Sequence, residues 1–134
     1  MKKKKYIYSN ENLEGLLKEI INFLWKYELY DGVSIYTMNK RYSFYDLSND
    51  LPKILFDNKI PIYLENNIDV KEFIEYSNPK TLTLVMEGEL NAYLYYRDVY
   101  DERNIYSKIT KIFEKYGFYM EFGSNYVIYA EENN

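Results

Sequence analysis

The sequence predicts a single α+β domain, residues 1–134, in which a largely antiparallel, mixed sheet of hairpins carries its helices on one face. The length of 134 residues suits one domain. The content of 47% hydrophobic and 28% charged residues indicates a packed core rather than a disordered chain. Segments with a helical hydrophobic period are interspersed with strand-like segments that short turns connect. The predicted order is αββαβαββαββ, and we expect residues 1–8 to be a partly frayed basic N-terminus.

The first helix is predicted around residues 13–24. Leucine and isoleucine recur there at i, i+3, i+4, i+7 and i+8, which places them on one side of a helix. Ser9 or Asn10 provides the N-cap, since either side chain accepts a hydrogen bond from the first turn. The pair Asp31-Gly32 is a turn signal, so we expect the helix to end there.

Residues 33–38 and 42–46 are predicted to form the first hairpin. Residues 33–38 alternate in the manner of a strand, and β-branched and aromatic side chains are frequent among them. A turn at Asn39-Lys40 would place Ile35 opposite Phe44, so we expect these two side chains to share the core face.

Three short elements are predicted next. Residues 51–57 favour a helix, because Pro52 is tolerated in a first turn. Residues 60–64 favour a strand, and Pro61 must begin it or lie at a sheet edge because proline has no backbone N–H. Residues 67–76 favour another short helix, whose inward side chains would be Val70, Phe73 and Ile74.

A second hairpin is predicted from residues 81–86 and 89–96, with its loop at Glu87-Gly88-Glu89. Two registers compete: a two-residue loop mixes polar and apolar side chains on each face, whereas a three-residue loop makes one face wholly apolar. We predict the second register for that reason. Its pairs are Met86 with Leu90, Leu84 with Ala92, and Leu82 with Leu94. The opposite face would then carry Asn91, Tyr93 and Tyr95.

The last predicted elements are a helix and a terminal hairpin. Asp101 is the expected N-cap, and Gly117 is the expected left-handed residue after the helix. Residues 118–122 and 126–130 alternate as strands around a turn at Gly123-Ser124, with or without Asn125. The predicted core consists of Leu16, Leu17, Ile20, Leu24, Ile35, Phe44, Leu82, Leu84, Leu94, Ile109, Phe113, Phe118 and Met120.

Acidic residues dominate the chain beyond its first residues. The net charge is −4, but Lys2–Lys5 hold four of the 17 basic residues, so residues 6–134 carry −8. Such a body argues against direct nucleic-acid binding, which needs a basic surface, and is compatible with a basic protein partner. No run of 18 apolar residues occurs, and no apolar segment follows the lysines. We therefore expect a cytoplasmic protein without a membrane partner.

Composition also excludes several kinds of catalytic site. The chain has no cysteine and no histidine, which excludes disulfides, thiolate zinc sites, cysteine nucleophiles and imidazole acid–base catalysis. The five glycines are scattered and form no phosphate-binding loop. Asp-x-Lys pairs of the kind that assist Mg²⁺ chemistry begin at Asp57 and Asp69, but this composition gives about two by chance. We predict no catalytic residue, no metal site and no cofactor.

Two functions remain open from the sequence. The first is a non-enzymatic, acidic protein-binding module of the inhibitor or immunity type, which sequesters a basic protein such as a toxin, nuclease or defence protein. The alternative is a small-molecule-binding domain or histidine-free enzyme with a tyrosine-lined pocket that contains a carboxylate. The first function predicts a binding site of acids and exposed aromatics. Its predicted residues are Glu87, Glu89, Asn91, Tyr93 and Tyr95, and the sequence leaves the oligomeric state open.

Overall fold

The computed structural model describes residues 10–48 and 50–132. The predicted frayed N-terminus, residues 1–8, and Ser9, one of the predicted N-caps, lie outside the described residues. The elements in chain order are α1 (Asn10–Lys26), β1 (Val33–Thr37), β2 (Lys40–Ser43), β3 (Lys53–Phe56), β4 (Ile60–Asn66), the 3-10 turn η1 (Val70–Glu72), β5 (Leu82–Met86), the π-helical turn η2 (Ala92–Tyr96), α2 (Ile105–Lys115), β6 (Phe118–Ser124) and β7 (Val127–Glu132).

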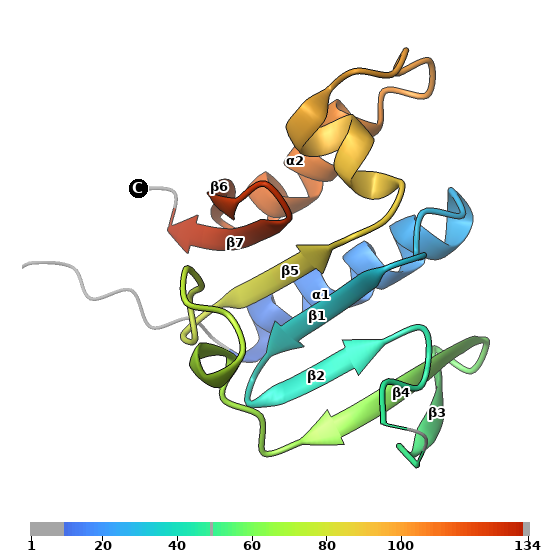
Figure 1. The fold of residues 1–134 in the computed structure, drawn as a ribbon, viewed down its shortest axis with the longest axis vertical. Coiled ribbons are helices and arrows are strands. Elements are labelled where there is room, and N and C mark those ends of the chain that lie inside the picture. Colours follow the sequence, from blue (N-terminus) through green and yellow to red (C-terminus); the bar gives the residue numbers. More distant parts are fainter. Residues whose placement is uncertain (1–9, 49, 133–134) are drawn as a thin grey trace, which may run out of the picture.

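The described residues form an α+β fold, which confirms the predicted fold class. All seven strands join one antiparallel sheet in the order β3-β4-β2-β1-β5-β7-β6 (Figure 1). Both helices lie behind this sheet in Figure 1 and therefore cover the same face.

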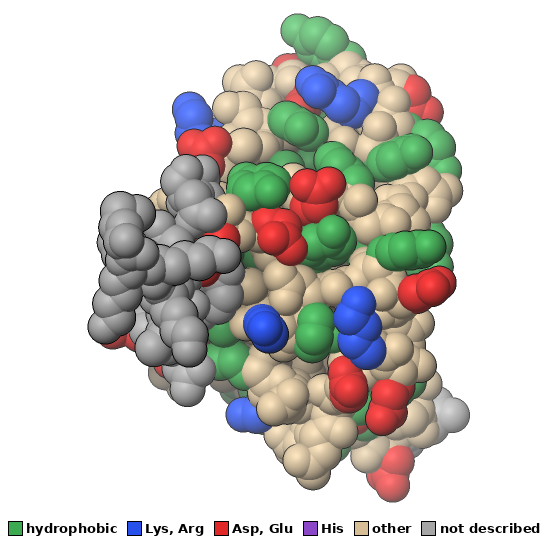
Figure 2. All heavy atoms as spheres, turned by 90° about the vertical axis from the view of Figure 1, so that its left-hand side faces the viewer, with side chains coloured by type: hydrophobic (Ala, Val, Ile, Leu, Met, Phe, Trp, Pro, Cys, Tyr) green, Lys and Arg blue, Asp and Glu red, His purple; other side chains and the backbone are tan. Residues whose placement is uncertain are grey.

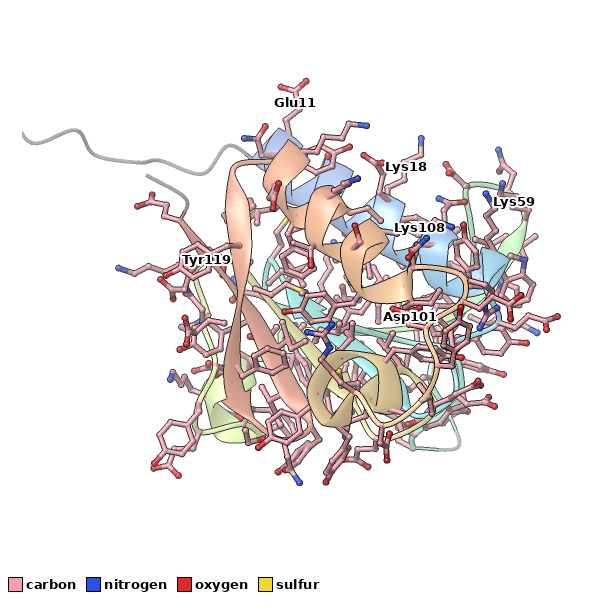
Figure 3. The ribbon with its side chains drawn as sticks, turned by 90° about the horizontal axis from the view of Figure 1, so that it is seen from above. Glu11, Lys18, Lys59, Asp101, Lys108 and Tyr119 are labelled. Carbon is pink, nitrogen blue, oxygen red and sulfur yellow. The ribbon has the colours of Figure 1, made fainter. Side chains whose placement is uncertain are left out.

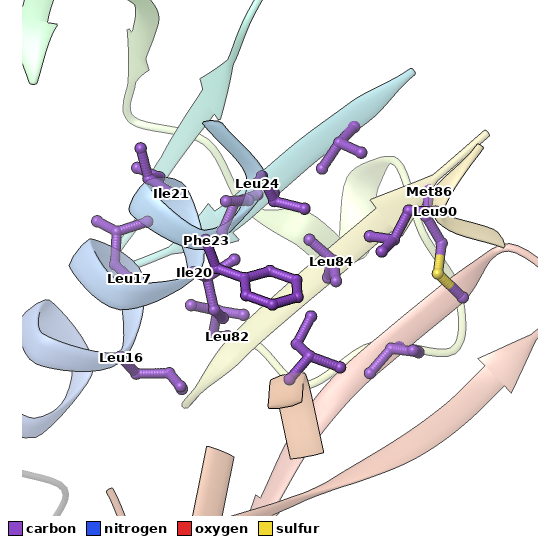
Figure 4. Packing of buried hydrophobic residues seen from close by; sticks show 14 of the residues in the cluster. Leu16, Leu17, Ile20, Ile21, Phe23, Leu24, Leu82, Leu84, Met86 and Leu90 are labelled. Carbon is purple, nitrogen blue, oxygen red and sulfur yellow. The ribbon is translucent and has the colours of Figure 1, made fainter. Parts of the chain in front are cut away.

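The core lies between the helices and the sheet. Figure 4 shows Ile20 and Leu24 of α1 directed at the strand that carries Leu84. Every predicted core residue is buried except Phe44 and Met120, which are partly buried at its margin. The hydrophobic period of the first helix therefore identified the correct inward face.

The first helix ends earlier than predicted, at Lys26 and not at Asp31-Gly32. The N–H of Leu29 donates to the carbonyl of Leu24 at 2.9 Å. Glu28 between them has a φ of 54°. A left-handed residue thus closes the helix, and the chain needs the remaining residues to turn into β1.

The first hairpin forms, but its predicted register is wrong. The two turn residues are Met38 and Asn39, with φ values of 50° and 60°, and not Asn39 and Lys40. Ile35 consequently pairs with Tyr42 instead of Phe44. Two left-handed residues give the twist that adjoining strands need, and Asn tolerates that conformation well.

Residues 51–57 contain β3 and not the predicted helix. The hairpin of β3 and β4 turns through residues 57–59, in which Asp57 and Asn58 have φ values of 54° and 61°, close to those in the first turn. Alternation decides the faces, because Ile54 is partly buried in the core whereas Leu55 is 62% exposed.

The predicted strand at 60–64 forms as β4, and Pro61 obeys its expected restriction. Pro61 is the second residue of the strand and pairs with Leu55 of β3. Pairing with β2 begins only at Tyr63. Pro61 therefore lies where β4 has a neighbour on one side alone.

Residues 67–76 contain only the single turn η1, where a helix was predicted. Asp69 caps it by accepting a hydrogen bond from the N–H of Lys71 at 3.0 Å. Val70 is buried on the second face of the sheet in a small cluster with Tyr36, Val85 and Val127. Phe73 is 51% exposed, contrary to the prediction, because its ring lies against the Arg41 guanidinium at 5.1 Å and not in the core.

The predicted hairpin of residues 81–86 and 89–96 is wrong in its second half. β5 forms as a fully buried strand, but β1 and β7 already occupy its two edges. Residues 89–96 instead form a helical turn, in which Leu90 and Leu94 are both buried in the core. These two side chains are four residues apart, so a helical turn places them on one side as well as a strand does.

The last helix and hairpin agree closely with the prediction. The N-cap residue of α2 is Asn104 and not Asp101, but the Asp101 carboxylate accepts hydrogen bonds from the N–H groups of Ile105 at 2.6 Å and Tyr106 at 3.0 Å in the first turn. Gly117 follows the helix with a φ of 88°. The hairpin of β6 and β7 turns at residues 125–126 and not at Gly123-Ser124, because a bulge at Gly123 moves the turn along the chain.

Candidate functional site

The structure separates the residues of the predicted binding site. Glu87 and Glu89 are exposed where β5 leads into the helical turn, and not at the tip of a hairpin. Asn91 is partly buried, and its Oδ1 atom is buried without a hydrogen-bond partner. The expected strand face therefore does not exist, since a helical turn distributes these side chains around its axis.

Tyr93 and Tyr95 have different neighbours. The Tyr93 hydroxyl accepts a hydrogen bond from Arg103 at 3.5 Å, and that guanidinium also lies 5.6 Å from the ring centre of Tyr27. The Tyr93 hydrogen bond is the largest contribution that raises the pKa of Arg103, and the charge of Glu89 adds to it. Tyr93 and Glu89 thus both interact with the positive charge of Arg103.

Tyr95 belongs to η2 and contacts the terminal hairpin at Phe122, close to the hairpin's turn. Its ring meets Phe122 edge-on, with 5.7 Å between the ring centres, and it meets Tyr96 in the same manner at 5.2 Å. The Tyr96 hydroxyl accepts a hydrogen bond from the Asn125 amide at 2.9 Å. Tyr95 is 45% exposed, so one predicted site residue contributes to an exposed aromatic group.

The terminal hairpin carries a group of acids and aromatics on the side that faces away from the core. Cross-strand pairing sets Tyr119 opposite Glu131 and Glu121 opposite Tyr129. Because side chains alternate along a strand, all four lie on one side, and we call them the outer hairpin face. Figure 3 shows Tyr119 directed away from α2, which carries Lys108. Figure 2 views the side of the molecule that this hairpin borders, where acidic and hydrophobic side chains lie next to one another.

The outer hairpin face is negatively charged and lacks a salt bridge within the described part of the chain. The ion pairs among the described residues are Lys18–Asp57, Arg41–Glu65 and Lys115–Glu19, and none of them involves Glu121 or Glu131. Glu131 accepts a hydrogen bond from the Asn78 amide at 3.1 Å. Burial raises the pKa of Tyr129, and the charges of Glu121 and Glu131 raise it further. The carboxylates of Glu121 and Glu131 thus make this face suited to a cationic partner.

A shallow cavity of about 350 Å³ adjoins the turn end of this hairpin. Phe73, Tyr76 and Tyr126 line it, and these side chains are 51%, 62% and 40% exposed. Gly123 permits the arrangement, because a Cβ at this position would overlap the carbonyl oxygen of Tyr76. Exposed aromatics therefore also lie at the turn end of this hairpin.

A second open cavity, of about 320 Å³, lies between α1, β2 and β3. Glu14, Lys18, Lys40 and Tyr42 supply its polar side chains. Burial raises the pKa of Tyr42, and the negative charge of Glu14 contributes to the same shift. A phenol and a carboxylate thus line the same cavity.

The carboxylates of the two Asp-x-Lys pairs have structural contacts. Asp57 lies in the β3–β4 turn, 3.5 Å from the ammonium group of Lys18, and Asp69 caps η1. Within the described residues, no group of three or more His, Cys, Asp or Glu side chains is placed to hold a metal ion. No helix there combines the length and apolar character that crossing a bilayer requires.

The sequence contains a signal for the outer hairpin face. Residues 118–122 and 126–130 were predicted as paired strands, and alternation places Tyr119 with Glu121 and Tyr129 with Glu131. Whether the two pairs share a face depends on where the turn and the Gly123 bulge fall. Comparison of this chain with protein-family models, with curated proteins and with solved structures gave no match.

Proposed function

We propose that this chain is a non-enzymatic protein-binding module of the inhibitor or immunity type, which sequesters a basic protein. The observation that carries the proposal is the outer hairpin face, where two glutamates that form no salt bridge with another described residue alternate with two tyrosines. A toxin, nuclease or defence protein with a basic surface is the partner that this chemistry fits.

The physical roles of these residues differ. The glutamates attract a basic surface over several ångströms, which speeds encounter, and the net charge of −8 on residues 6–134 acts in the same direction. The tyrosines supply rigid contact area that is desolvated when the complex forms. An arginine of the partner can interact with both kinds of residue, because its guanidinium pairs with a glutamate carboxylate and stacks on a tyrosine ring.

The sequence-predicted residues fit this proposal in part. Tyr95 is exposed and contacts Phe122 on the side of β6 opposite the outer hairpin face, so we assign it to the edge of the contact area. Glu87 and Glu89 keep their exposed positions and contribute to long-range attraction. Asn91 and Tyr93 face other neighbours and are the residues least suited to contact.

Affinity capture from the native host tests the proposal with two double variants of equal charge change. Glu121→Lys with Glu131→Lys reverses the outer hairpin face. Glu11→Lys with Glu114→Lys reverses two exposed acids on the helices and is the matched control. We expect the wild-type chain and the control to retain one stoichiometric basic protein that the first variant loses. Equal capture by both variants, or an acidic partner, would rule out this site or this class of partner.

The cavity beside Tyr42 favours the alternative function, binding of a small molecule. Its volume of about 320 Å³ is at the lower end of the range for ligand sites, and it combines a tyrosine with the carboxylate of Glu14. A ligand would raise the melting temperature of the wild-type chain in a small-molecule screen. The same ligand would have a weaker effect on Tyr42→Phe or Glu14→Gln if it binds in this cavity.

A further inference from the structure

The strand β6 forms one edge of the sheet. It pairs with β7 on one side, and no other described strand lies beyond it. In an edge strand, every second residue directs its backbone N–H and C=O groups outward, where another strand can bind them. Figure 3 looks onto this edge from above, with α2 to one side of the hairpin.

We propose that β6 receives an extended basic segment of the partner as an eighth strand of the sheet. This inference rests on the proposed function and specifies how the partner is recognised. Strand addition takes its affinity from main-chain hydrogen bonds and its specificity from alternate side chains. The segment that fits is therefore defined by the side chains that border the two sides of β6.

On the outer side, the added strand would lie next to Tyr119 and Glu121. Neighbouring strands are about 4.8 Å apart, so a lysine or arginine on the new strand reaches the Glu121 carboxylate and the Tyr119 ring. Glu131 lies one strand further and increases the attraction. Basic residues are thus expected at every second position of the partner segment.

On the inner side, the added strand would border Met120 and Phe122. Both side chains are partly buried against the core, and the ring of Tyr95 lies on Phe122. Apolar side chains of the new strand would extend this cluster and remove it from water. The inferred partner segment therefore alternates basic and apolar residues along the part of β6 that begins at Tyr119.

A second copy of the chain is a poorer occupant of the same edge. Antiparallel pairing of two β6 strands about their centre would bring the Glu121 carboxylates of both copies together. Like charges at directly opposed positions destabilise a strand pair. Charge thus favours a basic segment over self-association, and acidic side chains at an edge are a known protection against the latter.

Synthetic peptides test the inference on the full-length chain. The probe is Lys-Val-Lys-Val-Lys-Val-Lys with blocked termini, titrated into the ¹⁵N-labelled protein at about 50 mM salt, where screening is weak. Two further peptides carry backbone N-methyl groups either on all lysines or on all valines, which blocks one hydrogen-bonding edge and keeps the charge. We expect one N-methylated peptide to bind at least tenfold more weakly than the parent and the other to bind like the parent. Alternate β6 amides should exchange more slowly in the complex.

Protein variants complete this test. Glu121→Lys should weaken binding of the parent peptide at least tenfold, whereas Glu114→Lys, the same change on the exposed side of α2, should not. Equal binding of all three peptides would overturn strand addition but leave the acidic face as a binding site. No binding of the parent peptide, or a protein dimer that excludes it, would also overturn the inference. The capture experiment fails or succeeds independently, because it depends on the native partner and not on these peptides.

Discussion

Gly15 lies on the side of α1 that faces α2, and a Cβ at this position would overlap the ring of Tyr116. The Tyr116 hydroxyl donates a hydrogen bond to Glu19, which also pairs with Lys115 at 2.9 Å. Glycine is unfavourable inside a helix by about 1 kcal/mol relative to alanine. The close approach of the two helices at this point explains why glycine is nevertheless suitable.

Gly15→Ala is therefore expected to lower the free energy of unfolding by about 1 kcal/mol, since the ring of Tyr116 would have to move from its hydrogen bond. Urea melts measure the change. In a Tyr116→Ala background the same substitution should raise stability, because only the helix propensity remains. Stabilisation by Gly15→Ala in the otherwise wild-type chain would contradict this account.

The ionisation of Glu19 gives a prediction for acid stability. Burial alone would raise the pKa of Glu19, but the hydrogen bonds from Tyr116 and Lys115 outweigh it and lower the pKa below the usual value. A lowered pKa in the folded chain contributes stability above the unfolded pKa, which is about 4.3, and this stability is lost as pH falls through the folded pKa. Glu19→Gln should reduce this acid-dependent loss in urea melts between about pH 5 and 2.

The hydrogen bond to Glu19, together with burial, raises the pKa of Tyr116. A raised pKa contributes stability below the unfolded value of about 10, which is lost as pH rises through the folded pKa.

Between pH 6 and 8, urea melts should give a nearly constant stability, since the chain has no histidine or cysteine. A slope equivalent to one proton in that window would reveal a strongly shifted group that this account lacks.

At the scale of elements, the core prediction can be tested at Leu84 of β5 and Phe113 of α2, both of which are fully buried. Leu84→Ala and Phe113→Ala should each lower the free energy of unfolding by about 2–5 kcal/mol, because they remove apolar contacts and leave cavities. Leu55→Ala is the control, since 62% of that side chain is exposed. A decrease in the free energy of unfolding below about 0.5 kcal/mol at both buried positions would contradict the packing of Leu84 and Phe113 in the core.

Elements with long or unambiguous patterns could be predicted from the sequence. The stripe of α1, the first-turn carboxylate and final glycine of α2, and the alternation in β6 and β7 each have a local cause that tertiary contacts do not override. The predicted helix at 51–57 is wrong because a short segment fits either period. The turn at Asp57-Asn58 decides its conformation by returning the chain as a hairpin.

The segment 89–96 could not be assigned from its own pattern. Alternating Leu90 and Leu94 fit a strand and a helical turn equally well, and the sheet order decides between them. β5 has its edges filled by β1 and β7, which come from distant parts of the chain. The predicted strand face of Asn91, Tyr93 and Tyr95 is therefore absent, because η2 takes the place of the second strand. The outer hairpin face depends on pairing across a bulged turn, which local sequence does not determine.

At the scale of the whole molecule, charge should control the rate at which a partner binds. Glu121→Lys with Glu131→Lys is expected to slow association, and the effect should shrink as salt rises from about 50 to 500 mM, because screening shortens the range of the charges. Stopped-flow kinetics with the captured partner measure it. An effect of equal size at both salt concentrations would indicate lost contacts instead of lost attraction.

Tyrosine variants should act on dissociation. Tyr119→Ala is expected to raise the dissociation rate by an amount equivalent to about 2 kcal/mol if its ring is a central contact, and Tyr95→Ala to raise it less. Tyr93→Ala is the matched aromatic control, since its ring lies beside Arg103. Unchanged kinetics for Tyr119→Ala would remove the outer hairpin face from the contact area.

The sequence-predicted acids provide a comparison at equal charge. Glu87→Lys with Glu89→Lys should also slow association, but by less than the hairpin variant. These side chains contribute only long-range electrostatic attraction and no direct contact with the partner. Circular dichroism and melting curves must be unchanged for both. A larger effect at Glu87 and Glu89 would restore the surface that the sequence indicated.

The position of β5 between β1 and β7 also has a consequence for synthesis. β5 carries Leu82, Leu84 and Met86 without a charged residue, and β7 leaves the ribosome well after it. Until β7 pairs with it, the nascent chain has an uncharged apolar edge of the kind that aggregates. Once the β6–β7 hairpin has joined, the edge of the finished sheet is a strand that contains Glu121. The same hairpin that forms the candidate site therefore protects the protein during biogenesis, and truncation before Phe118 should yield insoluble chains.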